Sequence, residues 1–409
     1  MTENKQRFNP WRGLKGLPHN MWTLFVATLI NRSGTMVLPF LAIYMTKQLH
    51  ISEAYAGLMV AAYGAGALVT APFVGKIADK VGALRVMKFS LSVTGLILFV
   101  YPLFTNFYLL LAFTFLWAII NESFRPANMS LISEVVASNQ RRTAFALNRL
   151  AINLGMSIGP AVGGLLTLIN FSIIFYVDGF TAICAAVFLA AVRWDKIEGL
   201  DDSVIQDHTI EEKHINVLKD RRFLYFTLAM LPIPLIYFQH LSAMPLFLVN
   251  DLDLSPAVYG ALALVNTGLI IFFEVPLNNY LAAWSDRKNL ALGALLIGLG
   301  FGAMAFATGI PFLVVSIIIW TIGEMIAFPA SAAYVSEISP AKKRGEYMGF
   351  FQMNFSFSFM VGPWVGTLVL EKLGPFTLWI GTFILGLFSA IMMLRLKEKG
   401  KPAGFEENK

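Results

Sequence analysis

The sequence predicts an all-α, polytopic membrane protein with twelve transmembrane helices, and three observations carry this prediction. The 409-residue chain is 57% apolar and only 14% charged, whereas soluble domains are about 25% charged. Its apolar residues occur in blocks of about twenty or more, the length that crosses a hydrocarbon core about 30 Å thick. The blocks also fall into two similar sets. These observations exclude a soluble enzyme, a nucleic-acid-binding module, a disordered chain and a membrane β-barrel, whose strands alternate apolar and polar residues over about ten positions.

The spans divide the chain into two domains of six helices. The first six are expected at 20–46, 54–74, 86–104, 107–136, 143–168 and 172–193. The second six are expected at 221–250, 256–281, 289–308, 311–337, 345–370 and 374–395. Residues 1–193 and 221–409 are thus the two domains, and the Asp- and Glu-rich segment 194–220 is a cytoplasmic linker. The basic stretch 1–19 is not part of a cleaved signal peptide, because the apolar segment after it is too long and lacks a cleavage site.

Basic residues predict the orientation of these spans. With a cytoplasmic N-terminus, every cytoplasmic loop and both tails carry Lys or Arg, whereas the outer loops carry only Lys47 and Lys372. This bias follows the positive-inside rule. We therefore expect a bacterial-type inner-membrane protein with both termini in the cytoplasm. The net charge of +6 then reflects orientation and contact with lipid headgroups, not nucleic-acid binding.

The two halves of the sequence repeat each other. Trp117 and Trp320 are 203 positions apart, and the same offset relates Pro126 to Pro329 and Gly159-Pro160 to Gly362-Pro363. Six spans per half keep both copies in one orientation, so the repeat is parallel. Transporters built this way bind substrate near the bilayer midplane, between the two halves.

Two motifs contain closely spaced glycines. The loop between spans two and three reads Gly75-Lys-Ile-Ala-Asp79-Lys-Val-Gly82-Ala-Leu-Arg85, and glycines there permit a tight turn. Span five reads Gly155-x3-Gly159-Pro160-x2-Gly163-Gly164, and span eleven echoes it as Gly362-Pro363-x2-Gly366. Small residues let helices approach closely, and a proline in a span leaves backbone groups that neighbouring helices must satisfy.

With these motifs, the whole chain resembles a major facilitator superfamily transporter. The loop 75–85 resembles the superfamily's signature between helices two and three, although Ala83 and Leu84 replace the usual basic residues. The span-five pattern resembles the motif of the drug–proton antiporter branch. The resemblance implies two pseudo-symmetric six-helix bundles that rock about a central site.

The resemblance also implies roles for the two motifs. Asp79 would belong to a cytoplasmic charge network that latches the outward-open state, with Arg141 or Arg142 as its partner. The glycines of span five would form a helix seam that keeps the pore from leaking. The alternative for both motifs is plain turn formation and helix packing.

Seven ionisable residues lie within the spans, and four of them are near midspan: Arg32, Glu122, Arg125 and Glu324. Each would cost roughly 2.5–3.5 kcal/mol at the bilayer centre if unpaired, so such residues normally face the bundle interior. In the family, spans one, four, seven and ten line the central cavity, which is where this energetic argument places the four. The other three have expected structural roles: Arg149, Asp178 and Glu274.

Glu122 is the first proton-coupling candidate. It lies three residues before Arg125, close enough for an ion pair on one helix, although Pro126 predicts a kink there. Protonation of Glu122 would release Arg125 to another partner, and Arg32 beside Asn31 is the other charge expected to respond. The alternative is a static structural ion pair.

Two further residues are proton-coupling candidates. Glu324 has no charged neighbour at helical spacing in its own half, and its alternative role is that of a hydrogen-bonded structural residue. His240 titrates nearest neutral pH, but its alternative role is packing.

The expected function is proton-coupled efflux of amphipathic or drug-like molecules. The alternatives are a specific metabolite, sugar or lipid carrier and, from another class, a non-transporting receptor. The sequence contains no phosphate-binding loop, nucleophile motif or metal-ligand cluster, and Cys184 is its one cysteine. We therefore expect no enzymatic activity, metal or cofactor. The expected partners are a small-molecule substrate, protons and membrane lipids, and the expected state is a monomer.

Overall fold

The computed structural model describes residues 16–137, 140–192, 194, 217–281, 284–340 and 343–396. Helices and short turns make up all of this part, and no strand occurs among the described residues. Helices satisfy their backbone hydrogen bonds internally, as a bilayer requires. Ten described stretches are long and apolar enough to cross a membrane. The prediction of an all-α membrane protein is confirmed.

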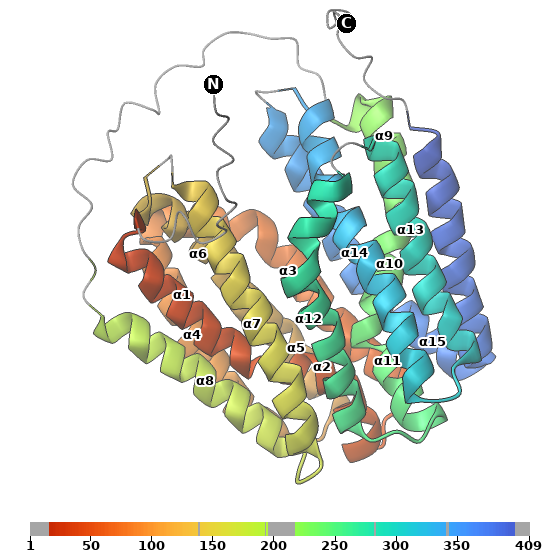
Figure 1. Cartoon of the computed structure of the whole chain (residues 1–409). Coiled ribbons are helices and arrows are strands. Elements are labelled where there is room, and N and C mark those ends of the chain that lie inside the picture. The colour runs from red at the N-terminus through yellow and green to blue at the C-terminus, as the bar shows by residue number, and fades with distance from the viewer. Residues whose placement is uncertain are drawn as a thin grey trace, which may run out of the picture.

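In the described part of the first half there are eight α-helices (Figure 1): α1 (His19–Gly34), α2 (Val37–Ile43), α3 (Glu53–Val81), α4 (Ala83–Val100), α5 (Phe107–Glu122), α6 (Phe124–Val135), α7 (Arg141–Thr167) and α8 (Ser172–Ala191). Breaks divide two of the predicted spans, because α1 and α2 together occupy the first and α5 and α6 the fourth.

The described residues of the second half form seven α-helices: α9 (Arg221–Met230), α10 (Pro232–Tyr237), α11 (Ala243–Leu246), α12 (Pro256–Leu281), α13 (Asp286–Ala303), α14 (Ile310–Ile338) and α15 (Arg344–Leu394). A 3₁₀ turn at Phe238–Leu241 separates α10 from α11 inside the seventh predicted span. The predicted spans 345–370 and 374–395 are continuous in α15. Gly374 interrupts that helix with a φ of 82°, a left-handed conformation that glycine adopts readily.

The backbone reproduces the sequence repeat residue by residue. Features 203 positions apart match in three pairs: helices α4 and α13, the π-helical turns Tyr44–Gln48 and Phe247–Asp251, and the left-handed residues His50 and Asp253. The two halves are therefore pseudo-symmetric copies, as predicted.

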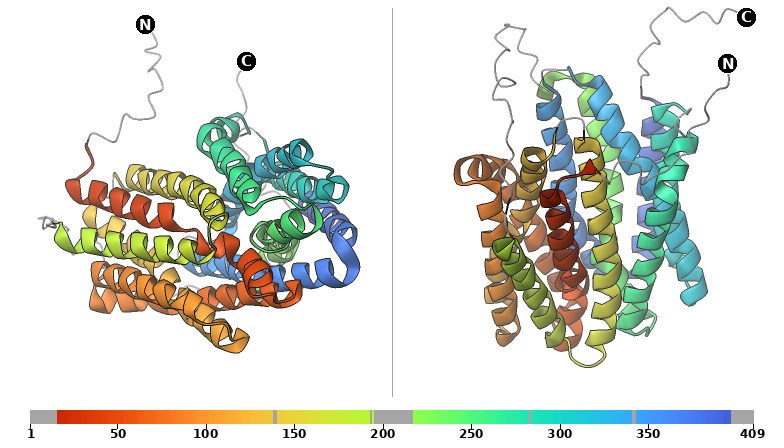
Figure 2. Two further views of the ribbon diagram at one scale, coloured as in Figure 1. Left: turned by 90° about the horizontal axis from the view of Figure 1, so that it is seen from below. Right: turned by 60° about the vertical axis from the view of Figure 1, so that its left-hand side comes forward.

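Each half packs as a bundle, and the two bundles meet mainly along two helix pairs. In the first half α1 packs on α7 and α8, and in the second α13 packs on α14 and α15. Across the halves, α3 packs on α15 and α7 packs on α12. Figure 2 shows the first-half helices, red to yellow-green, largely to one side of the green-to-blue second half.

The halves are joined at the lower end of Figure 1, which holds the connections 49–52, 252–255 and 371–374. Asn250 Nδ2 donates a hydrogen bond of 2.6 Å to Glu53 Oε1. The backbone N–H of Ala54 donates to Glu371 Oε2 at 2.7 Å. These contacts join the two bundles at the lower end, and we refer to this joined end as the closed lower end.

Candidate functional site

Glu122 lies at the end of α5 and is bound by a tyrosine. The Tyr63 hydroxyl, on α3, donates a hydrogen bond of 2.8 Å to Glu122 Oε1. Asn121 Nδ2 donates in turn to the Tyr63 hydroxyl oxygen at 2.6 Å. The Tyr63 side chain is 1% exposed, and its ring packs edge-on against Trp117. Packing thus fixes the phenol that holds the carboxyl.

Glu324 has a similar environment in the second half. The Tyr237 hydroxyl, at the end of α10, donates to Glu324 Oε1 at 3.3 Å. Asn266 Nδ2, on α12, donates to Glu324 Oε2 at 3.0 Å. Both donors are neutral, and they bind the carboxyl from two other spans. Neutral donors can bind a carboxyl in either protonation state, because the oxygens of a protonated carboxyl can still accept hydrogen bonds.

Aromatic rings connect these two sites. Phe359, on α15, lies 5.8 Å from the Tyr63 ring and is stacked at 4.5 Å on Phe238, beside Tyr237. Trp320 packs edge-on against the Tyr237 ring at 6.2 Å. A series of ring contacts therefore runs from Tyr63, which binds Glu122, through Phe359 and Phe238 to Tyr237, which binds Glu324.

Arg32 lies on α1 with unused hydrogen-bonding capacity. Its guanidinium carbon is 5.9 Å from the centroid of the Phe124 ring. Its Nε atom is buried and has no hydrogen-bond partner among the described residues. Helix α7 fixes the stem of this side chain, because a Cβ at Gly155 would collide with the Cβ of Arg32. The neighbouring Asn31 is buried.

The predicted ion pair between Glu122 and Arg125 is not formed. Helix α5 ends at Glu122 and α6 begins at Phe124, so the two residues are not on one continuous helix. Pro126 has no N–H to donate to the carbonyl of Glu122, four residues earlier, and this breaks the helix. Arg125 is exposed, and among the described residues it forms no ion pair.

His240 has a packed position in the 3₁₀ turn of the seventh span. Its Nδ1 lies 2.6 Å from the carbonyl oxygen of Tyr237, and its ring stacks on Trp320. The geometry therefore matches its alternative, packing role and places it beside the tyrosine that binds Glu324.

The other three charges within the spans join helices. Asp178 Oδ2 accepts hydrogen bonds of 3.1 Å from the backbone N–H groups of Met36 and Val37. These N–H groups begin α2, so the carboxyl caps the break in the first span. Arg149 on α7 forms an ion pair with Glu274 on α12, which links the two halves.

The latch motif is described only in part. Helix α3 continues to Val81, so Gly75 lies within a helix and not in a turn, which corrects that prediction. The turn is at Gly82, whose φ is 97°, and Arg85 Nη1 donates to the Val81 carbonyl at 3.4 Å. The backbone of Gly75, Asp79, Arg141 and Arg142 is described, but the surroundings of these four residues of the predicted latch lie outside the described part.

The predicted seam glycines lie at close helix contacts. A Cβ at Gly159 would come within 2.6 Å of the Thr35 carbonyl oxygen, at the break between α1 and α2. Gly164 faces the other half, where its Cβ would be 3.0 Å from the Cα of Ala257 on α12. The remaining members of the motif, Pro160 and Gly163, lie on the same helix. Their equivalents in span eleven, Gly362, Pro363 and Gly366, lie on α15.

Sequence reasoning missed the neutral donors Tyr63, Tyr237 and Asn266. A signal for two of them, Tyr63 and Asn266, does exist in the repeat, because Tyr63 and Asn121 are 203 positions before Asn266 and Glu324. The hydrogen-bonded pair in the first half thus has an equivalent hydrogen-bonded pair in the second.

Several known proteins are similar to this chain. YqjV, an MFS-type transporter of Bacillus subtilis, is 26% identical over 379 residues, which cover 90% of this chain and 91% of that protein. A Na(+), Li(+), K(+)/H(+) antiporter of Planococcus maritimus is 22% identical over 399 residues, 88% of this chain and 91% of the antiporter. Multidrug resistance protein MdtH of Edwardsiella ictaluri is 24% identical over 297 residues, 71% of each chain.

Solved structures share the fold at low identity. The nucleoside transporter NupG superposes with a TM-score of 0.77 at 15% identity, covering 93% of this chain and 100% of that chain. The D-xylose-proton symporter superposes with a TM-score of 0.72 at 15% identity, covering 92% of this chain and 97% of that chain. The sequence model of the Major Facilitator Superfamily matches residues 23–273 and 228–409. This chain is therefore a transporter of the Major Facilitator Superfamily.

Proposed function

We propose that this transporter exports amphipathic, drug-like molecules in exchange for protons, by rocking its two bundles about the site between Glu122 and Glu324. The observation that carries the proposal is this pair of carboxyls, one in each half, each bound by a tyrosine hydroxyl. A coupling site must gain and lose a proton without losing its shape, and neutral donors permit that.

Arg32 is the charge that responds to proton movement. Its guanidinium lies over the ring of Phe124, two residues after Glu122. When Glu122 is ionised, its carboxylate balances the charge of this guanidinium. When Glu122 takes up a proton, the free Nε of Arg32 can bind an acceptor on the substrate instead. Proton and substrate thereby compete for one set of groups.

The closed lower end sets the direction of access. On the topology expected from the basic residues, the lower end faces outward, so this structure is closed to the outside. Substrate then enters from the cytoplasm or from the inner leaflet. The ion pair between Arg149 and Glu274 joins the halves through α7 and α12. For export it must exchange partners as the bundles rock.

Two features support an amphipathic substrate. The surface between the carboxyls is aromatic, with Phe359 and Trp320 packed on the tyrosines. Aromatic rings bind apolar groups and, by their faces, organic cations. The similarity to MdtH, a multidrug resistance protein, agrees with a drug-like substrate, and the similarity to a Na(+), Li(+), K(+)/H(+) antiporter agrees with exchange for protons.

Transport by the full chain in proteoliposomes tests the proposal. Under an imposed pH gradient, we expect uptake of tetraphenylphosphonium into inverted vesicles, and none of a sugar or a lysophospholipid. Glu122→Gln imitates the protonated carboxyl, so it should abolish gradient-driven flux while leaving substrate exchange measurable. Glu134→Gln, at an exposed position of α6, is the matched control and should transport normally.

The same assay separates the two carboxyls. Full gradient-driven flux in Glu122→Gln with loss in Glu324→Gln would move the coupling role to Glu324. Full flux in both variants would disprove proton coupling through this pair. Uptake of the sugar alone would instead assign the chain to the carriers of specific metabolites.

A further inference from the structure

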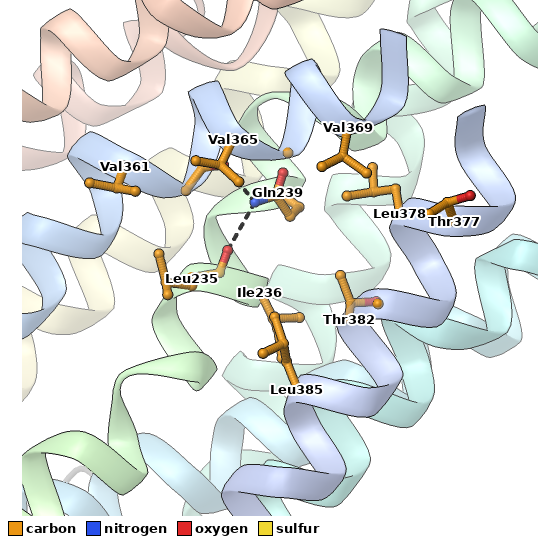
Figure 3. Close-up of a pocket in the computed structure, with 13 residues that line it drawn as sticks. Leu235, Ile236, Gln239, Val361, Val365, Val369, Thr377, Leu378, Thr382 and Leu385 are labelled. Carbon is orange, nitrogen blue, oxygen red and sulfur yellow. Dashed lines mark hydrogen bonds between the residues drawn. The ribbon is translucent and has the colours of Figure 1, made fainter. Parts of the chain in front are cut away.

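An apolar cavity of about 210 Å³ lies inside the second half (Figure 3), and neither carboxyl of the proposed site is among its lining residues. Helix α10 and the following 3₁₀ turn form one wall, through Leu235, Ile236 and Gln239. Two segments of α15, on either side of the bend at Gly374, form the rest, with Leu378 and Leu385 among the lining residues.

The repeat explains why the space is open. Gly381 lines the cavity and is 203 positions after Asp178. In the first half the equivalent position carries the Asp178 carboxyl, which caps α2. Gly381 has no side chain, and a Cβ built on it would meet no atom within 4 Å. Leu378 is likewise the smaller counterpart of Phe175. The second half therefore has smaller residues at two positions around this space than the first half has at the equivalent positions.

The walls of the cavity demand no polar ligand. The side-chain amide of Gln239 lies in the cavity wall, and its Nε2 already donates hydrogen bonds to the carbonyl oxygens of Leu235 at 3.0 Å and Gly362 at 2.8 Å. Leu235 is the counterpart of Arg32, so the charged residue of the first half is apolar here. An apolar cavity of about 150 Å³ stays free of water and takes up hydrocarbon such as benzene. The occupant that fits this larger cavity is therefore a hydrocarbon group.

The position of the cavity identifies the source of that hydrocarbon. Residues 235–239 are in the middle of the seventh span, at the depth of lipid tails and not of headgroups. Val365 and Leu385 line the cavity and are 43% and 42% exposed, so the cavity opens at the surface of the protein. We propose that the cavity binds one acyl chain of a bilayer phospholipid. The chain packs there against the turn that carries Tyr237, the donor to Glu324.

Photo-labelling of the full protein in nanodiscs tests this proposal. The probe is a phosphatidylcholine with a diazirine in the middle of one acyl chain, and labelled peptides are mapped by mass spectrometry. We expect labelling at 235–239 and 377–385 well above that at Phe272, which is 72% exposed on α12. Gly381→Leu fills the cavity without a backbone clash, so it should reduce cavity labelling to the level at Phe272.

Two controls keep the result interpretable. Gly349→Leu is the matched variant, because Gly349 is also on α15 with no atom near a built Cβ, and its cavity labelling should equal that of the unmodified chain. Gly381→Ala should give an intermediate loss and is available if the leucine variant folds poorly. Equal cavity labelling in Gly381→Leu and the unmodified chain would overturn the proposal. So would displacement of the label by tetraphenylphosphonium, which would assign the cavity to the transported compound.

Discussion

At the scale of single residues, Glu122 and Glu324 are not at equivalent positions of the repeat, because they are 202 positions apart and the repeat has an offset of 203. Glu324 is equivalent to Asn121, so the carboxyl–amide pair of Glu324 and Asn266 corresponds to the amide–phenol pair of Asn121 and Tyr63. Glu122 is an additional acid, one residue further along α5. The first half also contributes Arg32, whose counterpart is Leu235. In the proposed site, a substrate between the bundles would meet a cation and a carboxyl on the side of the first half and a carboxyl on the side of the second.

Tyr237→Phe tests whether the phenol positions Glu324. The variant removes the hydroxyl that donates to Glu324 Oε1 and keeps the ring. A hydrogen bond to a charged group contributes about 1.5–3 kcal/mol, so pH-gradient-driven flux should fall about tenfold or more, at about 1.4 kcal/mol per factor of ten. Tyr225→Phe, whose hydroxyl donates to the Met392 carbonyl, is the control and should retain full flux. Equal flux in the two variants would contradict a positioning role for Tyr237.

Sequence reasoning at this scale found charges and missed the groups that hold them. Glu122, Glu324 and Arg32 could be predicted because an ionisable residue near midspan is costly and so faces the bundle interior. Tyr237 could not, because a tyrosine in an apolar span carries no such signal. The pairing of Glu122 with Arg125 failed for a local reason, since Pro126 ended the helix on which the spacing argument depended.

At the scale of helices, prolines free carbonyl groups that other elements must satisfy. Pro329 lies inside α14 and cannot donate to the carbonyl of Met325, four residues earlier. Asn278 Nδ2, on α12, donates to this carbonyl oxygen at 3.0 Å and also to the Glu274 carbonyl at 2.8 Å. Helix α14 therefore stays continuous through its proline, whereas the equivalent Pro126 stands at the break between α5 and α6.

Asn278→Ala should destabilise the second bundle. It leaves the Met325 carbonyl without its donor, and a buried unsatisfied group costs about 1–3 kcal/mol. We expect a lower midpoint of thermal unfolding in detergent, followed by intrinsic tryptophan fluorescence. Asn279→Ala changes the exposed neighbour on the same helix and should leave the midpoint unchanged. Indistinguishable midpoints would show that the amide does not support the α14 backbone.

The sequence predicts where the membrane spans lie, but it does not predict where the helices inside those spans are interrupted. Length and hydropathy determine where a helix must cross the bilayer, as at 172–193, which α8 occupies almost completely. The break between α1 and α2 depends instead on Asp178, which is distant in sequence and supplies the cap. Tertiary contacts of this kind have no local signature.

At the scale of the whole molecule, the repeat predicts the two bundles but not which end of the molecule is closed. That end depends on contacts between residues of different halves, such as Glu53 with Asn250 and Glu371 with Ala54. One sequence must serve a state closed at the lower end and a state closed at the opposite end. The spacing of residues within each half therefore cannot predict which end is closed.

Glu53 makes the closed lower end sensitive to pH. It precedes the predicted span 54–74, and burial against the second half raises the pKa of its carboxyl above the ordinary value of 4.5. The Asn250 hydrogen bond and Lys47 act against this rise of the pKa, whereas Asp251 and Glu371 add to it. The closed state therefore binds the proton more tightly than an open state in which Glu53 is exposed. By linkage, closure is favoured at low pH and loses stability as the pH rises from 4.5 through the raised pKa.

Glu53→Gln should remove this pH dependence while keeping the lower end closed, because the glutamine oxygen can still accept from Asn250 and is never charged. Spin labels at Thr105 and Thr308, which are exposed at the lower end in opposite halves, report the distance between the bundles by pulsed electron resonance. In the otherwise unmodified protein, the population of longer distances should grow as the pH rises above 4.5. In Glu53→Gln the short distance should persist throughout, and Glu134→Gln should behave as the unmodified chain. A pH response that survives in Glu53→Gln would show that another group controls the closure, with Glu371, which caps α3 from the other half, as the next residue to test.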